Sequence, residues 1–176
     1  MIRESEHKSK PFGRLLSAIA ALVLLCTAVP LQAQEPPPRP VIITANPSQP
    51  LAFGAFSPGA SGGTVTVSPG GTRSAGGSVV LLSLGHVYTP AMFYVRANPG
   101  TVLSVLVPPP AILTGSGGGT LSLQINGSLP SSPFVTTLPW PQQTTLLVGG
   151  TLTIGNIATN PPGTYTGTYT ITLIRE

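Results

Sequence analysis

Acidic and basic side chains are scarce in this chain. Only 7% of its 176 residues are charged, and aspartate is absent. Beyond residue 33, lysine and cysteine are also absent, His86 is the one histidine, and the two carboxylates, Glu35 and Glu176, are near the two ends. A carboxylate pair for glycoside hydrolysis, a metal ligand set and an acid to orient a catalytic histidine are therefore missing. We expect a protein that is not an enzyme, with no catalytic residue, cofactor or metal site.

The chain has a single cysteine, and beyond residue 33 its positive charges are few and scattered. The single cysteine, Cys26, lies in an apolar run near the start, so the remaining chain can form no disulfide bond. Residues 34–176 keep four arginines against two glutamates, a net charge of +2. Four scattered arginines cannot form the basic stripe that contacts a phosphate backbone, so we expect no nucleic-acid partner.

The first 33 residues have the order of an export signal. Arg3, Lys8, Lys10 and Arg14 precede an apolar run over residues 15–29 that ends in small residues before Gln34. Charged, apolar and small-residue regions in this order predict a signal peptide, cleaved after Ala33. The alternative is a retained membrane anchor, but the run is shorter than the roughly 20 apolar residues of a spanning helix. We expect a periplasmic, secreted or cell-surface protein with no membrane span in its mature part.

The remaining chain predicts a short linker and one all-β domain. Residues 34–40 include four prolines, which favour an extended, polyproline-type tether. Residues 41–176 contain no stretch with apolar residues at helical spacing, and glycine and proline recur throughout. Many short β-prone runs between turn signals predict an immunoglobulin-like sandwich of about seven to nine strands.

Several segments carry a specific strand or turn prediction. Alternation predicts half-buried strands with Val65 and Val67 inward, with Leu121, Leu123 and Ile125 inward, and over Tyr165 to Leu173. Dense apolar runs predict core strands at 78–84 and 91–96, and a strand is also expected over 102–107. Asn126-Gly127 predicts a tight hairpin turn, and 144–154 predicts a strand with a bulge or bend at Gly149-Gly150.

Two places are candidates for contact with a ligand. Trp140 lies between two prolines with Phe134 nearby, and together they could form an exposed aromatic contact patch; the alternative is that the tryptophan covers one end of the core. His86 follows Gly85 at the end of a strand-like run and is either a ligand contact at the rim of the sandwich or a solvated turn histidine. Asn126-Gly127-Ser128 also matches an N-glycosylation pattern, which the turn explains equally well.

Two parts of the chain resemble a bacterial family. Residues 51–59 and 62–74, with the run Thr64-Val65-Thr66-Val67-Ser68-Pro69, resemble the opening of domain-of-unknown-function family 4402. Residues 147–155 and 163–169 are similar to its end, so the resemblance spans roughly residues 41–174. It implies a secreted or periplasmic protein with a sandwich similar to fimbrial subunits, and it transfers no catalytic or binding residues. The family usually closes on an aromatic strand terminus, whereas this chain ends Leu173-Ile174-Arg175-Glu176.

Two functions from different classes fit these observations. The first is a structural or adhesive subunit, pilin-like, that associates with copies of itself or with other surface subunits by strand addition at a sheet edge. The lack of lysine supports this function, because lysine side chains usually protect exposed sheet edges from pairing with another chain. Residues 41–45, behind the proline tether, have the form of a donor segment for a neighbouring molecule. The second function is a monomeric secreted ligand-binding module with Trp140 and Phe134 as its contact patch.

Overall fold

The computed structural model describes residues 39–176, which belong to one compact unit, Pro38–Glu176. The predicted signal peptide and most of the tether lie outside the described residues. The described part is all-β, as predicted: it contains strands, turns and loops without a helix. No helix that could cross a membrane is found within it.

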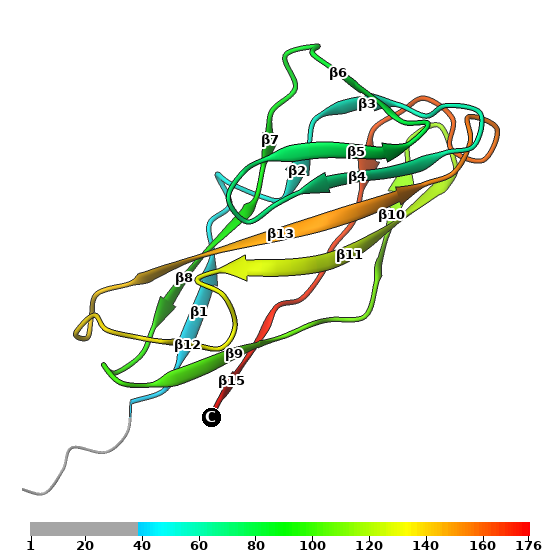
Figure 1. Cartoon of the computed structure of the whole chain (residues 1–176). Helices are drawn as coiled ribbons and strands as arrows, with labels where there is room; N and C mark the ends of the chain where they lie inside the picture. Colours follow the sequence, from blue (N-terminus) through cyan, green and yellow to red (C-terminus); the bar gives the residue numbers. More distant parts are fainter. Residues whose placement is uncertain (1–38) are drawn as a thin grey trace, which may run out of the picture. The chain divides into compact units, whose positions relative to one another are not determined.

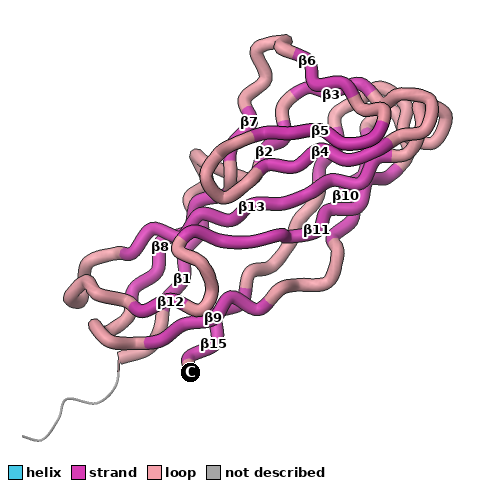
Figure 2. The backbone as a smooth tube through the Cα atoms, in the orientation of Figure 1, coloured by secondary structure: helices cyan, strands magenta, loops and turns pink. Residues whose placement is uncertain are grey.

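Fifteen strands, most of them short, make up residues 39–176 (Figures 1 and 2). Their bounds are β1 Ile42–Ala45, β2 Ala52–Phe53, β3 Ala55–Ser57, β4 Gly63–Val67, β5 Arg73–Gly77, β6 Val80–Leu82, β7 Tyr88–Thr89, β8 Ala91–Arg96, β9 Val102–Leu106, β10 Ala111–Gly115, β11 Thr120–Leu129, β12 Phe134–Val135, β13 Thr144–Ile154, β14 Tyr165–Thr166 and β15 Thr172–Arg175. The number exceeds the prediction of about seven to nine because Gly54 and other turn residues divide the predicted runs into pieces of two to five residues.

The long strand β13 is the centre of the largest sheet (Figure 1). On one side it pairs antiparallel with β11. On its other side it pairs first with β8, through Thr144–Val148, and then with β4, through Gly150–Ile154. Six of its eight strands follow the order β1-β8-β13-β11-β10-β14. The other two, β4 and β5, extend the sheet from the second half of β13, where β4 pairs with β13 and β5 pairs with β4.

Gly149 lies where β13 exchanges its partner β8 for β4. A Cβ atom there would lie 2.6 Å from the Val67 carbonyl oxygen and 2.7 Å from the Pro69 nitrogen, so only glycine fits this close backbone approach. The irregularity predicted at Gly149-Gly150 is confirmed, although the extra residue of the bulge is Asn126 on the facing strand β11. The predicted hairpin turn at Asn126-Gly127 is therefore wrong: both residues lie inside β11, and β10 and β11 meet through the loop around Gly118 instead.

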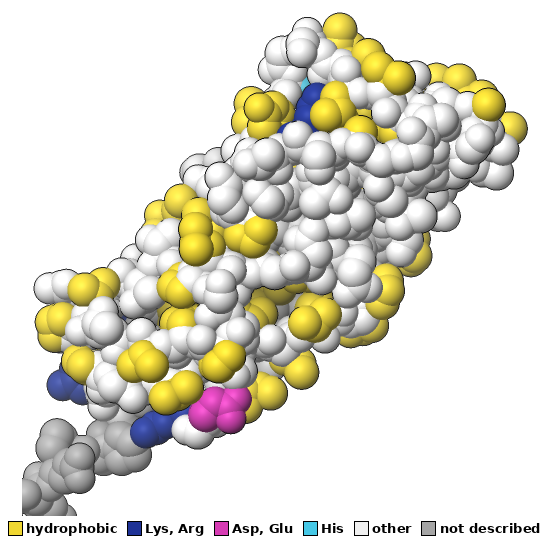
Figure 3. Space-filling model, viewed as in Figure 1, with side chains coloured by type: hydrophobic (Ala, Val, Ile, Leu, Met, Phe, Trp, Pro, Cys, Tyr) yellow, Lys and Arg dark blue, Asp and Glu magenta, His cyan; other side chains and the backbone are white. Residues whose placement is uncertain are grey.

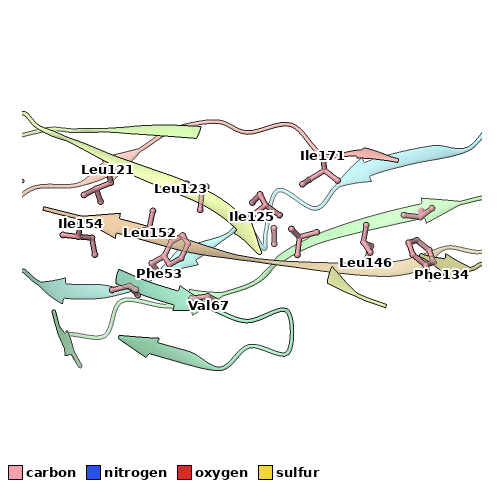
Figure 4. Packing of buried hydrophobic residues seen from close by; sticks show 14 of the residues in the cluster. Phe53, Val67, Leu121, Leu123, Ile125, Phe134, Leu146, Leu152, Ile154 and Ile171 are labelled. Carbon is pink, nitrogen blue, oxygen red and sulfur yellow. The ribbon is translucent and has the colours of Figure 1, made fainter. Parts of the chain in front are cut away.

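Three smaller sheets complete the fold: β12-β9-β15, β2-β7 and β3-β6. A single buried cluster joins side chains of the large sheet to those of the smaller ones, among them Leu103 of β9, Phe134 of β12 and Phe53 of β2 (Figure 4). This packing of sheets over one core is sandwich-like, as expected. The predicted inward faces are confirmed, because Val65, Val67, Leu121, Leu123 and Ile125 are all buried.

Two predicted strands differ from the structure. The segment 78–84 is not a core strand covered on both faces, because only Val80–Leu82 pairs, with β3, and Val80 and Leu84 are exposed. The alternating segment from Tyr165 to Leu173 is not one strand: β14 pairs with β10 in the large sheet, whereas β15 pairs with β9 in the three-stranded sheet. The chain crosses between the two layers in the intervening residues, and alternation alone does not reveal such a crossing.

The segment suggested as a donor strand is paired within its own chain. β1 forms an antiparallel ladder with β8 in which Ile42 faces Arg96 and Ala45 faces Phe93. Val41 and Ile43 also pack against the buried cluster. Residues 41–45 are thus an integral edge of the large sheet, which overturns their suggested role as a donor to another molecule.

Candidate functional site

The predicted aromatic patch of Trp140 and Phe134 is not formed. Phe134, in β12, points into the core and is only 6% exposed. Trp140 is half-buried, and the Arg39 guanidinium lies over its ring, 5.5 Å from the centroid. This cation–π contact fixes the end of the tether onto the domain. Trp140 therefore anchors the point where the tether joins the fold, and Phe134 is a core residue.

A groove of about 620 Å³ lies elsewhere, beside β2 and β3. Its inner wall consists of four buried apolar side chains from three strands that are far apart in the sequence: Phe53 of β2, Leu121 of β11, and Leu152 and Ile154 of β13. Figure 4 labels these four side chains within the core. A concave apolar surface of this size is the usual form of a ligand or peptide site.

The rim of the groove is also apolar but open to solvent. Leu84 and Val87, from the loop between β6 and β7, are 67% and 69% exposed, and Ile157 on the opposite loop is 57% exposed. Phe56 and Tyr165 add two aromatic rings to the lining. Exposed apolar side chains around an apolar hollow mark a surface suited to binding a partner or ligand. Figure 3 shows such hydrophobic side chains in groups on the drawn face, with very few charged ones.

One wall of the groove depends on a buried amide. The Asn160 side chain accepts a hydrogen bond from the Gly155 N–H at 2.5 Å and donates one to the Thr120 carbonyl at 2.7 Å. Asn156 accepts from the backbone N–H groups of Ala158 and Thr159 within the same loop. These bonds tie the loop that carries Ile157 to β11 and β13, so this wall of the groove is held in place.

Arg73, on β5, holds the other wall together. Its guanidinium donates to the Phe53 carbonyl at 3.1 Å and to the Leu82 carbonyl at 3.3 Å, and it stacks over the Tyr88 ring. Gly54, with φ +68°, makes this approach possible, since a Cβ atom would collide with the guanidinium. Among residues 39–176 the one carboxylate side chain is Glu176, which accepts a hydrogen bond from Ser104 on β9. Within residues 39–176, Arg73 therefore bonds to carbonyl oxygens and has no acidic partner.

His86 lies at the rim of the groove and is exposed. It follows Gly85, whose positive φ of 77° places it in a turn. Both interpretations of this residue, a solvated turn histidine and a ligand contact at the rim, agree with that position. The remaining polar groups in the lining are Ser57, Asn160, Thr164 and the Tyr165 hydroxyl.

The concave shape and the apolar lining of the groove suit it to binding. Within residues 39–176, no three His, Cys, Asp or Glu side chains come together as a metal site would require. The sequence did not indicate this site, because its lining comes from segments 51–58, 82–87, 113–121 and 152–165, each of which is an ordinary apolar or turn segment alone. Leu84 ended the segment 78–84 that was predicted as a core strand, and only the structure shows that it is exposed at the rim.

Comparison with known proteins identifies the family. No curated protein and no solved structure gives a significant match to this chain. A family model described as Domain of unknown function (DUF4402) matches residues 43–174, which begin in β1 and end in β15. Since this match covers nearly all of the folded domain, the chain belongs to the DUF4402 family.

Proposed function

We propose that this chain is an exported, non-enzymatic structural or adhesive protein of the cell surface that assembles with copies of itself or with other surface subunits by strand addition at a sheet edge. The observation that carries the proposal is the edge formed by β15. This strand pairs with β9 and has no second partner among residues 39–176. Its outer backbone groups can therefore pair with a strand from another molecule.

The chemistry of this edge supports the proposal. Edge strands are commonly protected by lysine or by inward-pointing charges. The described chain contains no lysine, and the charge on β15 is confined to its last residue, Arg175, so Thr172, Leu173 and Ile174 form an uncharged edge. Ile174 is 44% exposed, and Leu106 on the neighbouring β9 is exposed as well. An unprotected edge beside exposed apolar side chains favours association over a monomeric state.

The paired state of β1 restricts how this assembly can work. Because residues 41–45 complete the large sheet of their own chain, the added strand cannot be this segment without unfolding that edge. β15 is accordingly the acceptor edge, and the added strand comes from another part of a second chain or from another subunit.

A monomeric ligand-binding module is the second candidate. The groove beside β2 and β3 favours it, since its volume and apolar lining resemble those of small-molecule sites. The two functions differ in solution behaviour: a module of this kind stays monomeric at all concentrations, whereas an assembling subunit does not.

The size of the purified chain from Gln34 to Glu176 tests the choice, measured by light scattering over a range of concentrations. We expect multimers that grow with concentration and that are lost in Ile174→Lys, which adds charge to the β15 edge. Ile112→Lys is the control, because Ile112 is exposed on β10, where it faces Ser122 of β11 in the large sheet and not the β15 edge. A wild type that stays monomeric would favour the binding module, and equal effects of both lysines would contradict the role of this edge.

Export is tested separately. Expressed with its own leader in a bacterium, the protein should appear outside the cytoplasm with Gln34 as its first residue. An exported form that begins at Met1, or a protein found entirely in the cytoplasm, would contradict cleavage after Ala33.

A further inference from the structure

The groove and the start of β1 lie at opposite ends of the largest sheet. β1 begins at Ile42, which faces Arg96, close to the Thr144 end of β13. The groove is lined by Ile154, at the other end of β13. β13 has 11 residues, which at the ordinary strand rise gives a separation of about 35 Å. In Figure 1 the C-terminus and the start of β1 lie together, away from β2, β3 and β6.

The tether cannot reach the groove of its own chain. Arg39 is held against Trp140 by the cation–π contact, which leaves residues 34–38 to extend from that point. Five residues span at most about 18 Å when fully extended. In addition, β1 runs from Ile42 toward the groove, so its first residue is the one farthest from the groove. Any contact between the tether and a groove must be made with another molecule.

The groove has the chemistry to hold this segment. Proline-rich segments in the polyproline conformation bind to grooves lined by aromatic rings, which contact the proline rings while backbone carbonyls accept hydrogen bonds from the rim. Residues 36–38 are three consecutive prolines. Phe53, Phe56 and Tyr165 supply the aromatic lining, and Ser57, His86 and Thr164 supply polar groups.

Charge supports the same occupant. Glu35, directly before the prolines, is the one acidic residue between residues 7 and 175. Arg73 lies against Phe53 and Leu82, both of which line the groove, and no acidic side chain of the described residues contacts it. Arg73 does not itself line the groove, but its positive charge lies next to two lining residues and favours a segment that carries one carboxylate ahead of three prolines.

We infer that the groove of one molecule binds residues 34–38 of a second copy, with the prolines against Phe53, Phe56 and Tyr165 and with Glu35 on the side of the wall that Arg73 holds. This inference rests on the proposed self-association and names a surface distinct from the β15 edge. Because residues 34–38 and the groove are two different surfaces of the chain, the contact is head-to-tail, and its repetition produces an open chain or a ring of molecules rather than a two-fold dimer.

A peptide of residues 34–40 provides a direct test. Added to the 15N-labelled chain in which Pro36, Pro37 and Pro38 are replaced by serine, it should shift amide signals of residues 51–58, 82–87 and 157–165. Ile157→Ser in that chain should weaken binding of the peptide about 10-fold. A peptide with Glu35→Arg, added to the chain that keeps Ile157, should also bind at least about 10-fold more weakly than the unchanged peptide. Ile112→Ser is the matched control, since Ile112 and Ile157 are both 57% exposed but only Ile157 lines the groove. Ile112→Ser should bind like the parent. A peptide that causes no shifts at millimolar concentration, or binding that Ile157→Ser leaves unchanged, would overturn the inference.

The multimers provide a second readout. Replacing the three prolines by serine, or Ile157→Ser, should lower the average mass of the assembly at least several-fold at a fixed concentration, while Ile112→Ser should not. An average mass that the proline variant leaves unchanged would contradict the groove contact and leave the proposed function standing. A wild type that is monomeric at all concentrations would instead contradict the assembly itself.

Discussion

The guanidinium of Arg73 lies 4.7 Å from the centroid of the Tyr88 ring, and the same group donates hydrogen bonds to the carbonyls of Phe53 and Leu82. One side chain on β5 thereby connects β2, β6 and β7, three strands whose own pairings involve only two or three residues. Short ladders of this kind have few backbone hydrogen bonds of their own. The wall of the groove therefore depends on Arg73 for its position.

Replacing Arg73 should destabilise the domain. Arg73→Met keeps the length of the side chain but removes both hydrogen bonds and the cation–π contact, so we expect a loss of about 1–3 kcal/mol in the free energy of unfolding. Arg175→Met is the control, because Arg175 is exposed near the chain end, and its effect should stay within about 0.5 kcal/mol. Urea unfolding measures both values. Similar losses in the two variants would show that Arg73 does not hold the wall.

The exchange of partners along β13 should be sensitive to one methyl group. In Gly149→Ala the new Cβ would meet the backbone of Val67 and Pro69 below 3 Å, so the strands must separate. We expect a loss of more than about 2 kcal/mol in stability, of the order seen for overpacking. Gly70→Ala is the control, since a Cβ there meets only the Ser68 hydroxyl oxygen, at 3.8 Å, and φ is not positive. Thermal unfolding of the two variants tests the difference, and equal midpoints would contradict the close approach at Gly149.

Local patterns in the sequence predicted those parts of the fold that depend on one strand and its inward face. Val65 and Val67 are buried as the alternation indicated, and the strand over 144–154 has the expected bounds. The errors arose where a pattern is compatible with two arrangements. Asn126-Gly127 suits a hairpin turn and also a bulge, and the choice depends on Gly149-Gly150, which are remote in sequence.

The groove could not be predicted for the same physical reason. Phe53, Leu121 and Leu152 each occupy an ordinary inward position on a strand, and only the packing of β2 against β11 and β13 creates a hollow between them. The predicted patch failed because Phe134 pairs against Leu103 in the three-stranded sheet, which turns its ring inward. Trp140, between two prolines, carried no signal that Arg39 would cover it.

Tyr169 gives the domain a defined response to alkaline pH. Desolvation by burial raises the pKa of Tyr169 from 10.0 to about 12. In the unfolded chain the phenol loses its proton near pH 10.0, whereas the folded protein keeps it. Between these two pH values the unfolded state binds fewer protons, so the free energy of unfolding falls as pH rises. The contribution is complete below pH 10 and is lost by about pH 12, with a total of at most about 3 kcal/mol.

Tyr169→Phe should remove this part of the pH dependence. The wild type should lose more stability than the variant between pH 10 and pH 12 in urea titrations at fixed ionic strength. The difference in ultraviolet absorbance between the two proteins, followed against pH, reports the phenol directly and should have its midpoint at about 12. A midpoint near 10 would show that the Tyr169 ring is hydrated in the folded protein.

Two N-terminal truncations should separate the role of β1 from that of the tether. A chain that begins at Asn46 lacks β1 and therefore loses its ladder with β8 and the packing of Val41 and Ile43. Loss of the apolar contacts alone should lower the free energy of unfolding by about 2–4 kcal/mol, and the exposed edge of β8 should promote aggregation.

A chain that begins at Arg39 keeps β1 and the contact between Arg39 and Trp140. Its stability should match that of the chain from Gln34 within about 0.5 kcal/mol, yet the average mass of its multimers should fall at least several-fold because the segment that enters the neighbouring groove is gone. Hydrogen exchange adds an independent measurement: amides of residues 42–45 that bond to β8 should be protected in the wild type even under dilute, monomeric conditions. Rapid exchange there, or a stable monomer beginning at Asn46, would contradict the intramolecular pairing of β1. An average mass of multimers that is unchanged in the chain from Arg39 would show that the tether has no part in the assembly.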